Sequence, residues 1–219
     1  DRGMIWFSTW NGLERFDGYD FENFKTYPDS KVHIANHRFV RLTKSSLDNI
    51  WCTSYDQSCY LFDTKSLEYI DIKDIDSRLN HLIVSVIPLN DGVTYLLGSM
   101  GEIYRIDENL LPDATAISQI SNNGIGGVIH AVYRDKSGSE WILSENGTVR
   151  MGSDHLGSLM PFQFVEESGD CLYLATSKGY VACYDMGKDN LHVCLEQGRV
   201  PGIDHLNRLE DGRLVLSHA

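Results

Sequence analysis

The sequence predicts an all-β protein, a β-propeller built from four-stranded blades, and three observations support this. One motif recurs along the chain, a turn-forming segment rich in Asp, Gly or Ser precedes most copies, and the strands are apolar on both faces. The anchors of the motif lie 45, 44, 46, 32 and 42 residues apart. They are Trp6, Trp51, Tyr95, Trp141, Tyr173 and Val215. A period of roughly 40 to 50 residues with about four short strands is typical of propeller blades.

The first repeat contains a hairpin signal, Asn11-Gly12 between two apolar runs. Asn and Gly tolerate the positive φ values of a type I′ turn, so the sequence predicts a turn at these two residues, with Trp10 opposite Leu13. Both faces of the first strand are apolar. Alternation places Ile5 and Phe7 on one face, and Met4, Trp6 and Trp10 on the other. A hairpin with one wet face would alternate with polar residues, so we expect these rings to be blade core.

The later repeats supply the remaining strands in order. Segments such as "RFVRLTK", "LIVSVIPL", "GVIHAVYRD" and "FQFVEES" precede the anchors and predict inner strands. Segments such as "SCYLFD", "GEIYRID" and "KGYVACYD" follow the anchors and predict third strands. The chain opens at the turn before a second strand and stops within the second strand of the sixth repeat, so residues 1–219 are expected to form one incomplete propeller of about five and a half blades.

The stretch "DRGMIWFSTWNGLERFDG" resembles the first repeat of the two-component regulator propeller family. "DNIWCTS" and "GSEWILSENG" match it moderately, and the repeats around Tyr95 and Tyr173 match only in outline. The family forms the periplasmic sensor region of hybrid two-component histidine kinases. The resemblance implies a fragment of a seven-bladed ring and a parent protein held in the inner membrane by parts absent from this sequence.

Composition restricts the partners. The 219 residues include 19 basic and 31 acidic ones, giving a formal charge of −12. No basic stripe stands out, so no nucleic-acid partner is expected. No apolar run approaches the roughly 18 residues of a membrane helix, and no signal peptide is visible.

Cysteine usage carries little functional signal. The five cysteines lack the CxxC spacing of a metal or redox site. The favoured interpretation is buried small apolar residues. A disulfide between Cys52 and Cys59, which could face each other across a hairpin, is the alternative, and Cys171 is expected near Cys183.

Catalytic motifs are missing from the sequence. It contains no GxSxG, HExxH or phosphate-binding glycine loop, and no cofactor is expected. Four aspartates recur at one blade position and are therefore interpreted as turn residues; they are Asp17, Asp63, Asp107 and Asp185. A glycosidase or lyase remains an alternative, since distant blades can contribute a catalytic pair.

Candidate ligand-binding residues lie on the loops around the central channel, where propellers carry their function. They are Trp10, Asn11, Asn36, His37, Arg38, Tyr55, Asp56, Gln57, Asn80 and His81. Exposed aromatic rings stack on sugar faces, and the polar side chains can bind hydroxyl groups. The alternative is that Asn and His only cap the loops, and that Trp10 packs across its hairpin.

The residues and the resemblance together predict a non-enzymatic periplasmic sensor that binds a glycan breakdown product. A neutral oligosaccharide is expected, because Arg38 and Arg78 are the only cations near the site and stand beside Asp56, Asp74 and Asp76. The resemblance implies a homodimer in the full-length receptor. The alternative is a scaffold that binds no small molecule and supports dimerisation.

Overall fold

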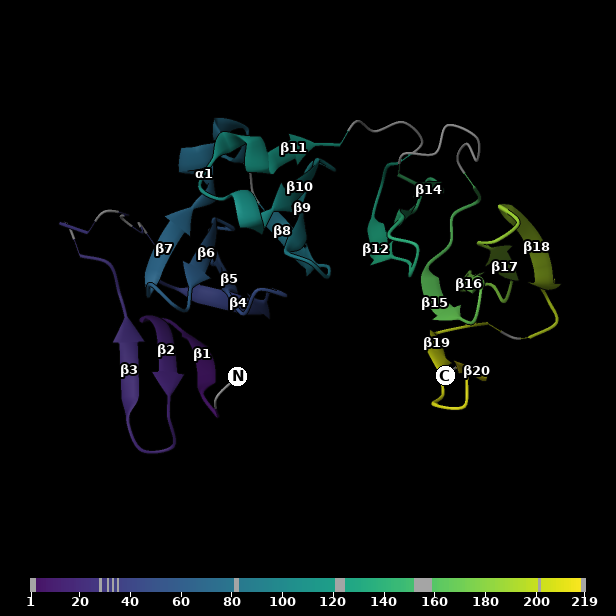
Figure 1. Cartoon of the computed structure of the whole chain (residues 1–219), viewed down its shortest axis with the longest axis horizontal. Helices are drawn as coiled ribbons and strands as arrows, with labels where there is room; N and C mark the ends of the chain where they lie inside the picture. Colours follow the sequence, from purple (N-terminus) through teal and green to yellow (C-terminus); the bar gives the residue numbers. More distant parts are fainter. Residues whose placement is uncertain are drawn as a thin grey trace. The chain divides into compact units, whose positions relative to one another are not determined.

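A computed structural model describes residues 3–27, 29–30, 32, 34, 36–80, 83–120, 125–151, 159–200 and 202–217. The chain divides into two compact units, Asp1–Ser121 and Asn122–Ala219, each of which is described by itself. The described residues form antiparallel sheets in both units (Figure 1). The predicted all-β fold with four-stranded repeats is confirmed, while one continuous propeller over residues 1–219 and a seven-bladed ring stay predictions.

The first unit contains three sheets in the strand orders β1-β2-β3, β4-β5-β6-β7 and β11-β10-β9-β8. Its strands are β1 (Ile5–Thr9), β2 (Gly12–Phe16), β3 (Phe21–Phe24), β4 (Phe39–Lys44), β5 (Ile50–Ser54), β6 (Cys59–Asp63), β7 (Glu68–Asp71), β8 (Ile83–Pro88), β9 (Val93–Gly98), β10 (Ile103–Asp107) and β11 (Ile117–Gln119). β1 lies against β4, and β4 lies against β8. Strands at the inner edges of successive sheets therefore neighbour one another, as they do in successive propeller blades.

Short helical turns, which the sequence analysis did not anticipate, connect some of these strands. They are α1 (Ile72–Ile75), η1 (Ser77–Leu79), η2 (Glu108–Leu110) and η3 (Ala114–Ala116). An aspartate side chain caps each one by accepting a backbone N–H two residues later, as Asp71 does from Lys73 at 3.2 Å. Such Asx caps satisfy backbone donors that the first helical turn leaves free. The pair α1–η1 matters because it borders the pocket described below.

The second unit contains sheets in the orders β12-β13-β14, β15-β16-β17-β18 and β19-β20. Its strands are β12 (Ile129–Arg134), β13 (Glu140–Ser144), β14 (Thr148–Arg150), β15 (Phe164–Ser168), β16 (Cys171–Ala175), β17 (Val181–Asp185), β18 (Asn190–Leu195), β19 (His205–Arg208) and β20 (Leu214–Ser217). β12 lies against β15, and β15 lies against β19. This unit repeats the arrangement of the first.

The core explains the apolar character of both strand faces. On β5, Trp51 packs into a cluster shared with β8–β10, whereas Ile50 and Cys52 pack into a cluster that includes Leu13 of β2. Consecutive residues thus point into the two neighbouring sheets, since side chains alternate along a strand. Three anchors, Trp51, Tyr95 and Trp141, are completely buried, as predicted.

The first sheet departs from the prediction. Trp6 is half-buried and contacts Phe24 and Phe62, with ring centroids 5.5 and 5.6 Å away. The opposite face of the sheet carries Phe7 and Phe21, both exposed and packed on each other at 5.8 Å. Only one face of this sheet is covered by described residues. The interpretation of all its rings as core was therefore wrong for the second face.

The five cysteines divide into a buried pair, a disulfide and one free, exposed residue, Cys194, for which the predicted burial is wrong. Cys52 and Cys59 are buried free thiols, which confirms the favoured interpretation for this pair and excludes the alternative disulfide. Burial raises the pKa of Cys52 well above its usual value and that of Cys59 to about 12. Cys171 and Cys183 form a disulfide between β16 and β17. The sequence placed these two residues near each other but did not predict the bond.

Candidate functional site

The turn after β1 carries the first candidate residues. Thr9 pairs with Gly12, so the two turn residues are Trp10 and Asn11, and the predicted turn at Asn11-Gly12 is wrong by one residue. The Thr9 hydroxyl explains the difference, because it accepts from the Asn11 N–H at 3.1 Å and donates to the Gly12 carbonyl at 2.8 Å. Such a side-chain turn competes with a type I′ turn. Trp10 consequently lies at the tip and does not pack across the strands.

Trp10, Arg38 and Tyr55 form one continuous surface, here called the aromatic platform. The Arg38 guanidinium carbon lies 4.3 Å from the centroid of the Trp10 ring and 5.5 Å from that of Tyr55. Both rings stay open to solvent, with Trp10 78% and Tyr55 71% exposed. Exposed cation–π contacts contribute about 0.5–1 kcal/mol each. These contacts orient two exposed rings on adjacent blade tips.

The backbone holds the platform in place. The Tyr55 N–H donates to the Arg38 carbonyl at 2.8 Å, which joins the loop before β4 to the turn after β5. The Asn36 side chain accepts from the Arg38 N–H at 3.0 Å. The platform is thus built from local backbone bonds as well as from ring contacts.

Asp56 follows Tyr55 and is ionised at neutral pH. Partial burial raises the pKa of Asp56, but hydrogen bonds from Ser54, Ser58 and Asn36 outweigh that effect and lower the pKa below its usual value. The Ser58 N–H donates to Oδ1 at 3.2 Å, and the Ser54 hydroxyl donates to the same oxygen. Asp56 therefore connects the platform loop, through Asn36, with the residues that follow β5.

Three further candidates lie close to the platform; Asn11 is exposed, whereas His37 and Gln57 are partly buried. Asn11 accepts from the Lys25 ammonium group, and His37 Nε2 accepts from the Thr26 N–H at 3.1 Å, so both contribute to loop structure. Gln57 has a positive φ of 64°, and its side-chain oxygen is buried without a hydrogen-bond partner among the described residues.

The last two candidates lie on the loop before β8. Asn80 is exposed and ends η1, while His81 lies outside the described residues.

A small pocket opens beside Asp56, with a volume of about 120 Å³. It is lined by Asp56, Ser58, Cys59, Asp71, Ile72, Lys73, Leu79, Asn80, Ile83 and Leu96. Two predicted residues, Asp56 and Asn80, thus line the same pocket. The other lining residues could not be identified from the sequence, because they come from α1, η1 and strand interiors. Asp71 and Asp76, which cap these helical turns, were the available signal.

Ion pairs already occupy most cations near this pocket. Lys73 Nζ lies 3.1 Å from Asp71 Oδ2, and burial is the main cause that raises the pKa of Asp71. Arg78 binds both carboxylate oxygens of Asp76. Among the described residues, Arg38 makes no ion pair with a carboxylate, and its guanidinium lies against the rings of Trp10 and Tyr55. The local charge is therefore close to balanced.

A larger groove of about 340 Å³ lies along the outer strands β3 and β7. It is lined by Asn23, Phe24, Lys25, Thr26, Ser30, Val32, Leu67, Glu68 and Tyr69. The Tyr69 hydroxyl donates to the Phe24 carbonyl at 2.7 Å, so it already stabilises the junction between the two sheets. None of the predicted site residues lines this groove.

The recurring aspartates are structural, as predicted. In each case Oδ1 accepts the backbone N–H two residues later, at 2.8 Å for Asp17, 2.8 Å for Asp63, 3.1 Å for Asp107 and 3.0 Å for Asp185. These bonds define Asx turns between strands. Their recurrence follows from turn geometry, and the positions give no sign of catalysis.

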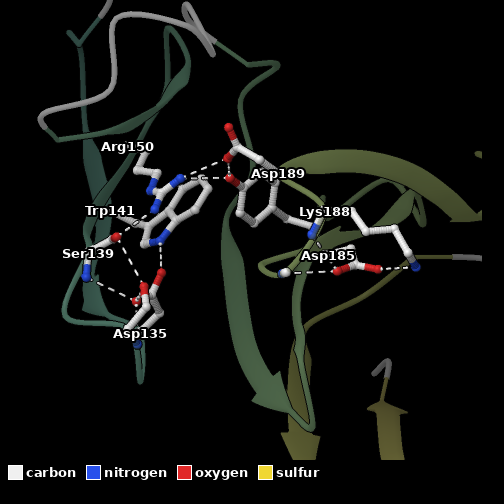
Figure 2. A network of polar contacts seen from close by, with 10 residues as sticks. Asp135, Ser139, Trp141, Arg150, Asp185, Lys188 and Asp189 are labelled. Carbon is white, nitrogen blue, oxygen red and sulfur yellow. Dashed lines mark hydrogen bonds and ion pairs between the residues drawn. The ribbon is translucent and has the colours of Figure 1, made fainter.

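Arg150 in the second unit offers a useful contrast to Arg38. Figure 2 shows it beside Trp141, and it donates from Nη1 to Tyr184 at 2.7 Å and to Asp189 at 2.9 Å. Its Nη2 donates to Ser139 at 2.8 Å. Because protein acceptors engage both terminal nitrogens of its guanidinium, Arg150 joins β14 to the neighbouring sheet.

Among the described residues, no group of three or more His, Cys, Asp or Glu side chains could hold a metal ion. No helix in the same part of the chain is long and apolar enough to cross a membrane.

Comparison with known proteins places the fold. No protein-family model and no curated protein matches the sequence. The chain is similar to a structure described as the extracellular domain of the hybrid two-component system BT3049 from B. thetaiotaomicron, with a TM-score of 0.58 and 15% identity over 97% of this chain and 30% of that one. The chain is also similar to the extracellular domain of the one-component system BT4673 from the same organism. That comparison has a TM-score of 0.56 and 15% identity over 99% of this chain and 29% of that one.

An enzyme is also among the similar structures. Catalytically inactive H270A virginiamycin B lyase from Staphylococcus aureus has a TM-score of 0.52 and 13% identity, over 79% of this chain and 60% of that one. At these identities the likeness shows the β-propeller fold alone. The chain spans less than a third of the length of the BT3049 and BT4673 domains.

Proposed function

We propose that this chain is an extracytoplasmic ligand-sensing domain of a hybrid two-component histidine kinase, and that it binds a short neutral oligosaccharide, a glycan breakdown product, on its loop face. The observation that carries the proposal is the aromatic platform. Two exposed rings on adjacent blade tips, held by Arg38, offer apolar faces on which a sugar ring can stack. Asp56 and Asn80 stand on the same set of loops and can bind hydroxyl groups.

Two observations support the extracytoplasmic setting. The fold is shared with extracellular domains of two-component systems. The Cys171–Cys183 disulfide fits an oxidising compartment, since disulfides are rare in the reducing cytosol. We place the domain in the periplasm, anchored to the inner membrane through other parts of its parent protein.

The neutral ligand is supported by charge. Lys73 and Arg78 are paired with Asp71 and Asp76, so a polyanionic sugar would meet few free cations. Each ligand charge taken from water needs a paired and hydrogen-bonded partner. A neutral oligosaccharide avoids that cost.

Signalling requires that the ligand prefer one state of the receptor. In the proposed receptor, a homodimer, binding would change the relation between propellers and between protomers. A switch from almost fully off to almost fully on needs about 10⁴-fold tighter binding to the active state, or about 5.5 kcal/mol. No kinase chemistry is assigned to this domain, which we propose to be non-enzymatic.

The binding proposal can be tested by titration calorimetry of this chain, and of the complete sensor region, against pools of short oligosaccharides. Replacing Trp10 or Tyr55 by alanine should weaken binding by roughly 2 kcal/mol, about thirty-fold in Kd, as removal of a central aromatic anchor does. Tyr19→Ala is the matched control, because Tyr19 is 90% exposed and lies outside the platform. Absence of binding to any pool would leave the scaffold function as the better account.

The fold similarity to a lyase motivates a second candidate, a propeller glycosidase or lyase. Incubation with the same oligosaccharides followed by product analysis discriminates the two. Unchanged oligosaccharides that bind would support the sensor, whereas shortened products that disappear with a purified Asp56→Asn variant would support an enzyme.

A further inference from the structure

The pocket beside Asp56 has a composition that limits what it can bind. It lies among the turn after β5, the helical turns α1 and η1, and the start of β8. One part of its lining is apolar and buried, formed by Cys59, Leu79, Ile83 and Leu96. The other part is polar. A ligand group that fits must therefore combine an apolar end with hydrogen-bonding atoms.

The polar side offers both acceptors and donors. Asp56 is an ionised acceptor at neutral pH. Asn80 is exposed, and its side-chain amide makes no hydrogen bond to another described residue, so it can both donate and accept. Lys73 Nζ is paired with Asp71 but keeps further N–H donors, since an ammonium group has three.

The size of the pocket excludes a whole sugar ring. A cavity of about 150 Å³ in a protein core accommodates benzene, and this pocket measures about 120 Å³. A hydroxylated sugar ring is larger than benzene, so only a substituent of the ring can enter. A hydroxyl group alone would leave the apolar side in contact with water.

An acetamido group satisfies each requirement. Its methyl group matches the apolar side formed by Leu79, Ile83 and Leu96, where burying one methyl contributes about 0.8 kcal/mol. Its N–H can donate to Asp56, and its carbonyl can accept from Asn80. It is also uncharged, which agrees with the balanced charge of the site.

We propose that this pocket binds the N-acetyl group of an acetamido sugar while the aromatic platform holds the sugar chain. The inference rests on the proposed oligosaccharide-binding function and adds the class of substituent that the site recognises. Tyr55 and Asp56 are consecutive residues, so the platform and the pocket meet at one turn. Asp56 and Asn80 are then specificity-determining residues.

Three trisaccharides with the same backbone provide the test. They are triacetylchitotriose, which carries acetamido groups; cellotriose, which carries hydroxyl groups at the same positions; and chitotriose, which carries free amines. Titration calorimetry on the 219-residue chain should show triacetylchitotriose binding at least about tenfold more tightly than cellotriose. Chitotriose should bind no more tightly than cellotriose at a pH where its amines are neutral.

Variants assign the preference to the pocket. Asn80→Leu should remove the preference for acetamido groups by filling the mouth of the pocket and deleting the amide, so that triacetylchitotriose binds no more tightly than cellotriose to this variant. Asn207→Ala is the matched control, since Asn207 is exposed and does not line the pocket. Thermal melts of both variants verify the fold, and Asn80→Ala is the fallback if the leucine variant is unstable.

The possible outcomes separate this inference from the proposed function. Equal binding of triacetylchitotriose and cellotriose, or a preference that survives both Asn80 variants, would overturn the acetamido assignment and leave oligosaccharide binding intact. Tighter binding of charged chitotriose would show that Asp56 selects an ammonium group, which also overturns it. If neither these sugars nor the oligosaccharide pools bind, the proposed function itself fails.

Discussion

Replacing Trp51 by phenylalanine tests how the sheets of the first unit are held together. Trp51 on β5 is completely buried, and its Nε1–H donates to Glu108 Oε1 of η2 at 2.7 Å. The Thr94 hydroxyl donates to the same oxygen at 2.7 Å, and Oε2 of Glu108 has no partner among the described residues. The buried carboxyl group therefore depends on two donors from two different sheets.

The cost of the substitution can be estimated from this geometry. Leaving a buried acceptor short of a donor costs about 1–3 kcal/mol, and the smaller ring leaves a cavity that adds about 1 kcal/mol. Trp51→Phe should thus lower the free energy of unfolding by about 2–4 kcal/mol. Urea denaturation followed by far-UV circular dichroism measures this, because that signal comes mainly from the backbone.

Two comparisons isolate the hydrogen bond. In a double-mutant cycle with Glu108→Leu, which removes the acceptor, we expect a coupling energy of about 1–2 kcal/mol. Trp141→Phe is the matched control. Trp141 donates to Asp135 Oδ2 at 2.8 Å, while the other carboxylate oxygen, Oδ1, accepts from the N–H groups of Ser137 and Ser139 at 2.9 and 3.0 Å. The Asp135 carboxylate thus keeps two backbone donors when the indole is removed, so the loss should be smaller. Equal losses at both tryptophans together with no coupling would refute the reasoning.

Four further predictions concern stability and binding. Trp51→Ala should lower the free energy of unfolding by about 3–5 kcal/mol, whereas Trp10→Ala should lower it by less than about 1.5 kcal/mol because Trp10 is exposed. Denaturant melts compare the two variants, and equal losses would make Trp10 part of the core. Replacing both Cys171 and Cys183 by serine should cost about 3 kcal/mol, judged from their separation of 12 residues, and melts with and without reductant should agree for that variant. Hydrogen bonds from backbone N–H groups lower the pKa of Asp17 in the folded chain. The ionised Asp17 therefore stabilises the fold above the unfolded pKa of 3.8, and this stabilisation is lost as the pH falls below 3.8. Asp17→Asn should flatten the pH dependence of the melting temperature near this pH. Oligosaccharide affinity should change less than about twofold between ionic strengths of about 0.01 and 0.15 M, and a steep loss with salt would contradict a neutral ligand.

Much of the architecture could be predicted because the same sequence pattern occurs in several repeats, so each repeat supports the assignment of the others. The anchor spacing is visible because the same motif recurs in several repeats. The two apolar faces of strands such as β5 can be predicted because side chains alternate along a strand, so its own sequence shows both faces. The turn aspartates were identified for the same reason, since an Asx turn is a local structure that needs only neighbouring backbone groups.

The turn of the first hairpin was predicted one residue too late, because two local hydrogen-bonding patterns compete there. Asn11-Gly12 favours a type I′ turn, but the Thr9 hydroxyl provides an alternative set of hydrogen bonds that moves the turn to Trp10 and Asn11. The predicted burial of the first sheet also failed on the face of Phe7 and Phe21. An apolar strand pattern shows that a face is able to pack against another sheet. It does not show whether such a sheet is present, and no sheet of the described residues covers this face.

The sequence by itself determined the strand content, the blade period, the loops that carry the candidate residues and the excess of acidic groups, because each is a property of composition or of residues close together in the chain. Only the tertiary structure decided that Arg38 lies between Trp10 and Tyr55, that Asp56 and Asn80 line one pocket, and that Trp51 donates to Glu108, 57 residues away. These contacts join different blades, and their geometry depends on how the sheets pack. Periodicity contains no information on that packing at the level of individual side chains, so the site could be located in the sequence but not assembled from it.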